Sequence, residues 1–381
     1  MSFVIAVVIG VLLLGLLIFV HEAGHFLVAK FFKVKVEEFG FGFPPRIWGR
    51  KSGETIYSIN AIPAGGFVRL LGEEGESANE PASFASKGPW VRAVIIAAGV
   101  VVNLIVAFIL FSALLVTSDF RTDIPLHIPT TGDRLELSFP FGKQTDGVLV
   151  VFVSPGSPAE RSGLEALDKV VSANGQSFTT ISRFQEFVTE NEGESLNLQV
   201  YNLLDRKTRS LTAIPRVNPP EGEGALGVVL DEVTTLRYDS VAEKIFVGSA
   251  HSVNMLYYQG QATGSVFLKA FEQRSVEPVA TTVSGPVGIA GLIGTFVGVT
   301  GTRGIWVLVE VVALISLILG VINILPIPAL DGGRLFFTVF EGVTGKKVNP
   351  NIERFIHTVG FAVLILLFLV ITYNDIIKIF R

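Results

Sequence analysis

Long apolar segments divide the chain into pieces of membrane-spanning size. Phe3–Val20 and Ala93–Ser118 contain no charged residue, and Ile305–Leu330 and Phe355–Ile371 are almost as apolar. A helix needs about 20 apolar residues to cross a bilayer, so the pattern predicts four transmembrane helices. The first segment could instead be a cleaved signal peptide. It lacks a basic start and a good cleavage site, so we expect it to be retained.

The polar stretch between the first two spans, residues 31–90, predicts a β-hairpin. Thr55–Pro63 partly alternates between apolar and polar residues, which is typical of a strand. Ala64–Gly66 has the small residues of a turn, and Phe67–Leu70 can then pair back on the first strand. We expect this loop to be cytoplasmic and membrane-associated.

The middle of the chain predicts a small α+β domain, because charge is ordinary there and Gly and Pro are frequent. The predicted elements are the strands Gly147–Val153, Lys169–Gly175, Ser195–Tyr201 and Thr208–Ile214, a short helix in Ser154–Leu164, and a helix at Ser182–Glu190. Tyr238–Ala270 has apolar residues at helical spacing but is too polar to span, so we expect interfacial helices. Thr281–Thr302 predicts a loop and helix on the membrane domain.

The third predicted span ends in a proline-containing sequence. Pro326 and Pro328 cannot continue a helix, so the backbone must open there. Open backbone at membrane depth is tolerated only inside protein or beside a water-filled cavity. Asn323 could satisfy the backbone groups that the prolines release, and Glu310 could face a pore or the membrane interface.

The expected fold is a multi-span α-helical membrane protein with a membrane-associated β-hairpin and an inserted α+β domain. Its parts are residues 1–30 (first span), 31–90 (loop with hairpin), 91–118 (second span), 119–235 (small domain), 236–303 (interfacial helices and connector), 304–334 (third span with broken end) and 335–381 (loop and fourth span). Basic residues gather in the first loop and before the fourth span. The positive-inside rule therefore places both loops in the cytoplasm, and the termini and small domain outside.

Composition excludes several classes of function. Of 381 residues, 49% are hydrophobic and only 17% are charged, whereas soluble proteins carry about 25% charged residues. The net charge of −4 does not support a nucleic-acid partner. The chain has no cysteine, so it has no thiolate nucleophile. Any bound metal must be held by histidines and carboxylates.

The clearest candidate chemistry is the sequence His21-Glu22-Ala23-Gly24-His25 at the end of the first span. Histidines four positions apart share one face of a helix, so both can reach one ion. Glu22 lies beside them, where it can take a proton from water. H-E-x-x-H on a helix is the zinc metalloprotease signature, and ionisable residues at membrane depth usually serve function. The sequence therefore predicts a zinc hydrolase.

A catalytic zinc site needs a third protein ligand. His127 and His251 lie in exterior segments, whereas the motif lies toward the cytoplasmic side. Asp331 lies at the cytoplasmic end of the third span, and His357 lies at the same end of the fourth. We expect Asp331 to be the third ligand, with His357 as the alternative. Asp-Gly-Gly could also be an ordinary turn.

These sequences resemble the site-2 protease family of intramembrane zinc metalloproteases, in its bacterial RseP/RasP-type branch. The resemblance covers essentially the whole chain. Its motifs are HEAGH, Gly99-x-x-x-Asn103, Ser284-Gly-Pro-Val-Gly288 and Asn323-x-x-Pro-x-Pro-x-x-Asp-Gly332. Residues 119–235 resemble a single PDZ domain, and some relatives carry two in tandem.

The resemblance implies a function and a set of site residues. The residues are the zinc ligands His21, His25 and Asp331, the general base Glu22, and the substrate contacts Asn323 and Pro326. The hairpin Ile56–Leu70 is implied to lie near the active site. The implied function is regulated intramembrane proteolysis of single-span membrane proteins that another protease has already shortened, such as anti-sigma factors, or of remnant signal peptides. The implied location is the bacterial inner membrane.

Some alternatives stay open at this point. The PDZ-like part has Leu167-Asp168 where PDZ domains usually have a Gly-Asp pair. Because of this departure, the part could act as a size filter for substrates instead of binding a terminal carboxylate. The chain could also be a non-catalytic PDZ scaffold or chaperone, or a metal transporter. A scaffold or chaperone leaves Glu22 and a complete set of zinc-ligand candidates unexplained. A metal transporter leaves Glu22 and the small domain unexplained.

Overall fold

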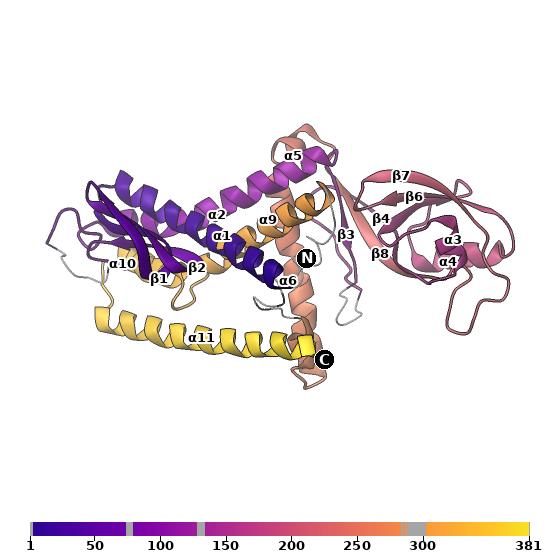
Figure 1. The fold of residues 1–381 in the computed structure, drawn as a ribbon. Helices are drawn as coiled ribbons and strands as arrows, with labels where there is room; N and C mark the ends of the chain where they lie inside the picture. Colours follow the sequence, from indigo (N-terminus) through magenta and orange to yellow (C-terminus); the bar gives the residue numbers. More distant parts are fainter. Residues whose placement is uncertain are drawn as a thin grey trace. The chain divides into compact units, whose positions relative to one another are not determined.

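A computed structural model of the chain describes residues 3–73, 79–127, 134–282, 285, 288 and 302–380. The chain divides into two compact units (Figure 1). The first unit comprises Met1–Leu110 and Val283–Arg381, and the second comprises Phe111–Thr282. The HEAGH sequence and Asp331 both belong to the first unit.

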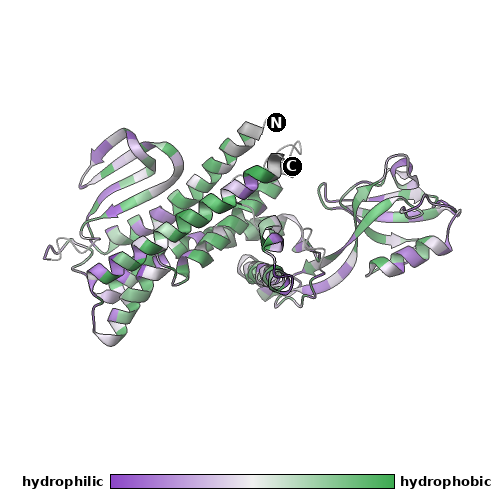
Figure 2. Cartoon of the chain, turned by 90° about the horizontal axis from the view of Figure 1, so that it is seen from below, coloured by the Kyte–Doolittle hydropathy of each residue, from purple (hydrophilic) through white to green (hydrophobic). Residues whose placement is uncertain are grey.

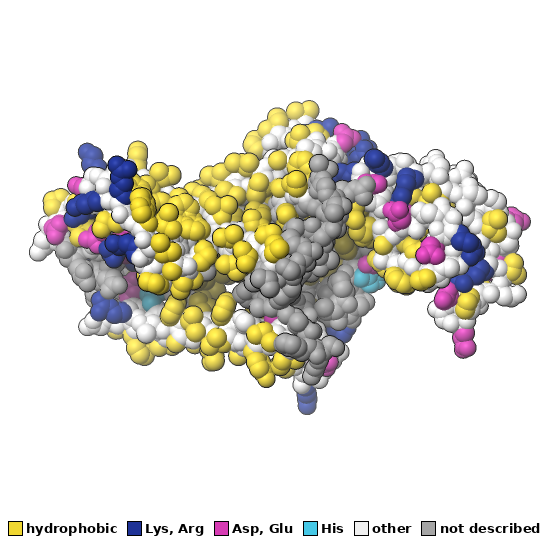
Figure 3. All heavy atoms as spheres, in the orientation of Figure 1, with side chains coloured by type: hydrophobic (Ala, Val, Ile, Leu, Met, Phe, Trp, Pro, Cys, Tyr) yellow, Lys and Arg dark blue, Asp and Glu magenta, His cyan; other side chains and the backbone are white. Residues whose placement is uncertain are grey.

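Four helices in the described part of the chain are long and apolar enough to cross a membrane. They are α1 (Phe3–Phe31), α2 (Pro89–Thr117), α9 (Thr302–Ile324) and α11 (Pro350–Phe380). Hydrophobic residues run along these helices (Figure 2), and Figure 3 shows hydrophobic side chains on their outer surface. An exposed apolar surface of this extent indicates that lipid surrounds these helices. The four predicted spans are confirmed, and the chain is a multi-pass membrane protein.

The third span is shorter than the sequence predicted. Helix α9 ends at Ile324, before the two prolines, and backbone-bonded turns lead to Leu330. A new helix, α10 (Asp331–Thr344), then begins. The predicted break is therefore present, but Asp331 lies in the first turn of a helix and not in open backbone. A carboxylate in that turn interacts favourably with the helix dipole.

Two glycines allow α10 to begin this close to the break. A Cβ on Gly332 would lie 2.0 Å from the carbonyl oxygen of Leu325. A Cβ on Gly333 would lie 2.6 Å from the carbonyl oxygen of Ile327. Any larger residue would push Asp331 and its helix away. The Asp-Gly-Gly sequence is thus a packing contact at a helix start and not an isolated turn.

The first unit also contains a two-stranded antiparallel sheet of β1 (Val36–Ser52) and β2 (Thr55–Leu70). The prediction that residues 55–63 pair with 67–70 is wrong. Both parts belong to one strand, β2, and both pair with β1. The reversal falls earlier, at Gly53, whose φ of +61° suits glycine. Register shifts along the pair let β1 contact both parts of β2.

The β1–β2 sheet lies directly on α1. A Cβ on Gly15 would lie 2.5 Å from the carbonyl oxygen of Pro63, and a Cβ on Gly66 would lie 3.1 Å from Phe19 Cα. Phe19 also stacks on Phe39 of β1, with ring centroids 4.8 Å apart. This close packing places the last part of β2 beside the end of α1 that carries HEAGH.

The second unit is built around a six-stranded sheet in the order β3-β8-β4-β5-β6-β7. The strands are β3 (Arg121–Pro125), β4 (Lys143–Val153), β5 (Asp168–Ala173), β6 (Leu196–Asn202), β7 (Lys207–Ala213) and β8 (Val228–Arg237). Helices α3 (Pro158–Ser162) and α4 (Ile181–Glu190) complete it, and its core includes Val148, Phe184 and Leu198. The predicted strands and helices are confirmed, but β3 and β8 were not predicted.

Helices follow the sheet, as the apolar spacing predicted. They are α5 (Val241–Ile245), α6 (Val247–Glu272) and α7 (Glu277–Thr282). Val241, Ile245 and Phe246 are exposed, and their interfacial role stays a prediction. The segment predicted as a loop and helix, Thr281–Thr302, lies almost wholly outside the described residues.

Candidate metal centre and active site

The HEAGH sequence forms a compact cluster of possible metal ligands on α1. Ligand atoms of His21, Glu22 and His25 all lie within 4.8 Å of one another. The two histidines are 6% and 7% exposed, so both side chains are buried. One turn of helix separates them, as their spacing predicted.

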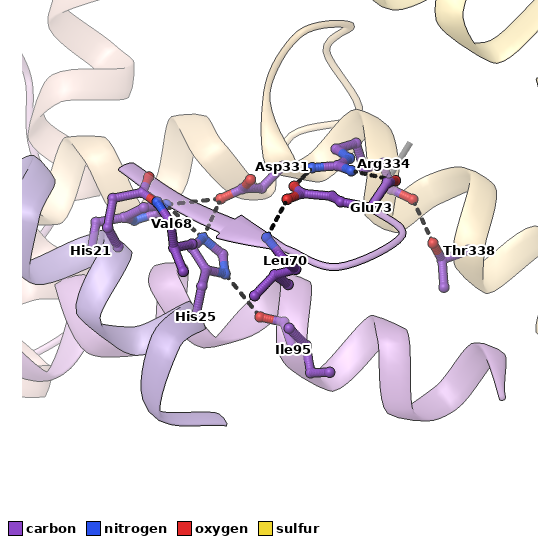
Figure 4. Close-up of polar contacts among 10 residues, drawn as sticks. His21, His25, Val68, Leu70, Glu73, Ile95, Asp331, Arg334 and Thr338 are labelled. Carbon is purple, nitrogen blue, oxygen red and sulfur yellow. Dashed lines mark hydrogen bonds and ion pairs between the residues drawn. The ribbon is translucent and has the colours of Figure 1, made fainter. Parts of the chain in front are cut away.

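Asp331 joins this cluster although it lies 310 positions from His21 in the sequence. Its Oδ2 lies 2.8 Å from His21 Nε2 and 3.2 Å from His25 Nε2 (Figure 4). The two Nε2 atoms are 3.2 Å apart. Ligands at about 2.0–2.2 Å from a tetrahedral zinc ion are separated by about 3.3 Å. The three atoms are therefore spaced as three corners of a zinc site.

Helix α2 orients the two imidazoles. His25 Nδ1 lies 2.8 Å from the carbonyl oxygen of Ile95, which can only accept, so Nδ1 carries the proton and Nε2 has a free lone pair. The Asn103 amide lies 3.2 Å from His21 Nδ1, and Asn103 is fully buried. Among the described residues, Asn103 Oδ1 has no hydrogen-bond partner. If the amide is rotated, Oδ1 accepts from Nδ1–H and leaves His21 Nε2 free as well.

Gly99 of α2 lets both imidazoles lie directly against the backbone of this helix. A Cβ at this position would lie 2.5 Å from His25 Nε2 and 2.6 Å from His21 Nε2. On the facing helix, a Cβ on Gly24 would lie 2.6 Å from the carbonyl oxygen of Ala98. Both glycines are needed for α1 and α2 to approach this closely.

These observations fit a zinc ion. The donor set is two imidazole nitrogens and one carboxylate oxygen, which leaves a fourth position for water or substrate, as in catalytic zinc sites. The two Nε2 atoms and Asp331 Oδ2 lie 2.8–3.2 Å from one another, so one ion can bind to all three. The residues that would hold the ion are His21, His25 and Asp331.

Glu22 is held by the backbone of β2. Its Oε2 accepts a hydrogen bond from the N–H of Val68 at 3.1 Å. In the turn after β2, Glu73 Oε2 accepts from the N–H of Leu70 at 3.2 Å, and Glu73 Oε1 pairs with Arg334 Nη1 at 2.5 Å (Figure 4). Sequence reasoning missed these contacts. A backbone N–H has no sequence signature, and only the opposite charges of Glu73 and Arg334 could have suggested their pairing.

His357 is bonded to a backbone group near the start of α10. Its Nδ1 accepts a hydrogen bond from the N–H of Ala329 at 2.9 Å, beside the break after α9. Asn323 lies partly buried in the last turn of α9, and Pro326 is exposed in the break. Their contact with substrate stays a prediction.

The remaining histidines have partners in the second unit. His127 pairs with Asp231. His251 is 3% exposed, and its Nδ1 lies 2.9 Å from the hydroxyl oxygen of Tyr238. Burial lowers the pKa of His251 to about 4, so it is neutral near pH 7 and supports the packing of α6. Glu310 is exposed on α9.

Replacing Gly99 with alanine should disrupt the cluster. The added methyl group would lie within 2.6 Å of both Nε2 atoms, so the imidazoles must move apart or α2 must shift. We expect zinc affinity to fall at least about tenfold, the lower end of what loss of a supporting contact costs. Competition with a chelator measures this. Gly88→Ala, where the added Cβ meets nothing within 4 Å, should leave the affinity unchanged. Equal affinities for the two variants would refute the proposed ion position.

Comparisons with known proteins relate the chain to one peptidase family. The family model for Peptidase family M50 matches residues 9–367. A protein of Clostridium acetobutylicum, provisionally named a zinc metalloprotease, is 34% identical over 97% of each chain. One from Clostridium perfringens with a similar provisional name is 30% identical over 97% of this chain and 98% of its own. Zinc metalloprotease RasP of Geobacillus kaustophilus is 29% identical over 97% of each chain.

Proposed function

The chain belongs to peptidase family M50 and is a zinc metalloprotease, and from this premise we propose that it hydrolyses a peptide bond in or near a transmembrane segment of its substrate. The observation that carries the proposal is the convergence of His21, His25 and Asp331 at the end of a membrane-spanning helix. A metal site on such a helix acts where membrane-embedded chains can reach it.

Each site residue has a proposed task. His21, His25 and Asp331 hold the zinc ion, which when bound polarises the scissile carbonyl and makes water more acidic. Glu22 takes a proton from the attacking water and later gives it to the leaving amine. Ile95 and Asn103 fix the orientation of the two imidazoles, since each contacts an Nδ1 atom.

The substrate must be extended at the cleavage point. A transmembrane helix hides its carbonyl groups in its own hydrogen bonds, and unwinding in lipid leaves each backbone group unpaired at a cost of several kcal/mol. Pairing with the edge of β2 offsets this cost through new backbone hydrogen bonds. The contact between Val68 and Glu22 supports this, because it places that edge beside the general base. Asn323 and Pro326 would line the extended substrate on the side of α9.

The substrates we propose are single-span membrane proteins that another protease has shortened, such as anti-sigma factors, and remnant signal peptides. We place the chain in the bacterial inner membrane with the HEAGH end of α1 toward the cytoplasm, because basic residues gather in the loops on that side. We propose that the β-rich second unit is a PDZ-like domain outside the cytoplasm. It would limit access to short substrates or bind their new C-termini.

A comparison of membrane proteomes tests the proposal. Cells with the active chain and cells with the Glu22→Gln variant should differ in membrane-embedded fragments, which accumulate intact when cleavage stops. The fragments that accumulate should then be cut by the purified chain in lipid vesicles, and a zinc chelator should stop the cut. If no fragment accumulates and none is cut, the proposed activity is wrong.

A further inference from the structure

The outer edge of β2 faces the active site. The N–H of Leu71 donates to the carbonyl oxygen of Lys35 at 3.0 Å, so this N–H points toward the β1 side of the strand. Successive residues of a strand point their N–H groups to opposite sides. The N–H groups of Val68 and Leu70 therefore point away from β1, toward α1 and α10. This is the edge that a substrate strand would join under the proposed function.

Two carboxylates occupy the N–H groups of this edge. Glu22 accepts from Val68 at 3.1 Å, and Glu73 accepts from Leu70 at 3.2 Å. Unpaired N–H groups on an edge strand invite another strand to bind, and proteins often block them. An incoming strand must take the same two N–H groups with its own carbonyl oxygens. The edge is thus closed until both carboxylates give way.

Arg334 holds Glu73 in this place. Its Nη1 lies 2.5 Å from Glu73 Oε1, and its Nη2 donates to the backbone oxygen of Glu73 at 3.3 Å (Figure 4). Arg334 is one turn after Asp331 on α10. Both side chains of the pair are partly shielded from water, at 34% and 24% exposed, so screening weakens it less than a surface pair. When Glu73 Oε2 releases the N–H of Leu70, Glu73 Oε1 can stay paired with the Arg334 guanidinium.

We propose that Glu73 is a latch that closes the substrate-binding edge of β2, and that Arg334 keeps it closed and receives it when it opens. A substrate carbonyl oxygen replaces Glu73 Oε2 on the N–H of Leu70. A second one replaces Glu22 on the N–H of Val68, which releases the general base toward the attacking water. Substrate binding and readiness for catalysis are then one event. This inference rests on the proposed function.

Replacing Glu73 with alanine should open the edge. We expect KM for a fluorophore-labelled synthetic signal-peptide remnant in detergent micelles to fall about tenfold, because one hydrogen bond to a charged acceptor no longer has to be replaced. The kcat value should stay within about twofold, since Glu22 and the metal ligands are untouched. Glu73→Gln keeps an acceptor but loses the ion pair, so its KM should lie between the two.

Hydrogen exchange at the amide of Leu70 gives a second readout that needs no cleavage. The exchange should be faster in Glu73→Ala than in the unchanged chain. Glu54→Ala is the matched control, because it removes one exposed carboxylate at the turn between β1 and β2. It should change neither KM nor the exchange at Leu70.

The outcomes distinguish the latch from a purely structural role of Glu73, and they test the latch separately from the proposed function. A higher KM or a loss of zinc in Glu73→Ala would mean that the pair with Arg334 only supports α10, and the latch would be wrong. Unchanged KM and unchanged Leu70 exchange would also overturn it. If the unchanged chain fails to cut the peptide, the proposed function is in doubt, while the exchange at Leu70 still decides on the latch.

Discussion

Glu22→Gln should abolish peptide hydrolysis and leave zinc bound. Glutamine has the same shape as glutamate, and its side-chain oxygen can still accept from the N–H of Val68. It cannot take a proton from water at neutral pH. Removing a general base typically lowers the rate by about 10²–10⁴-fold. Cleavage of a reconstituted substrate measures the rate, and elemental analysis measures the zinc.

The control for this variant is Glu54→Gln, the same change at an exposed position of the β1–β2 turn. It should keep both activity and zinc. Full activity of Glu22→Gln would falsify the role of Glu22 as base. Loss of zinc would instead make Glu22 a metal ligand. Its ligand atom lies within 4.8 Å of those of both histidines, so the zinc content must be measured together with the rate.

The features that the sequence predicted correctly depend on short stretches of chain. Membrane-spanning helices are recognisable because lipid demands a long apolar run wherever one occurs. The cluster of His21, Glu22 and His25 follows from helix geometry alone, since four residues make about one turn. The strands at the centre of the second unit are also local, because alternation and turns mark them.

The features that the sequence did not reveal depend on contacts between distant segments. The Phe39–Pro45 segment is rich in glycine, proline and phenylalanine and has no strand-like alternation of apolar and polar residues, yet it belongs to β1 because two separate parts of β2 pair with that strand. The pairing of Glu73 with Arg334 joins residues 261 positions apart. Neither partner has a local pattern that points to the other.

Helix α2 illustrates how one motif can serve several contacts. Gly99 lies against both imidazoles, and Asn103 is fully buried. Their position against the two imidazoles could not be predicted, because it depends on how α1 and α2 rotate about their axes. Gly99 and Asn103 thus position the two imidazoles through contacts that their spacing in the sequence does not predict.

Asp331→Ala should remove the third ligand and release zinc. The carboxylate oxygen lies 2.8 and 3.2 Å from the two Nε2 atoms, so its loss leaves two imidazoles to hold the ion. Loss of a supporting contact alone costs about 10–100-fold in metal affinity, and a direct ligand should cost at least as much. Elemental analysis of the purified variant, with helix content checked by circular dichroism, measures the loss.

The companion variant for Asp331→Ala is His357→Asn. The asparagine oxygen can still accept from the N–H of Ala329, so the turn before α10 should keep its shape. This variant should retain zinc and cleavage, because His357 is engaged with that backbone group and not with the HEAGH histidines. The opposite result, zinc kept by Asp331→Ala and lost by His357→Asn, would move the third ligand to α11. Such a result would contradict the position of Asp331 Oδ2, which lies 2.8 and 3.2 Å from the two Nε2 atoms.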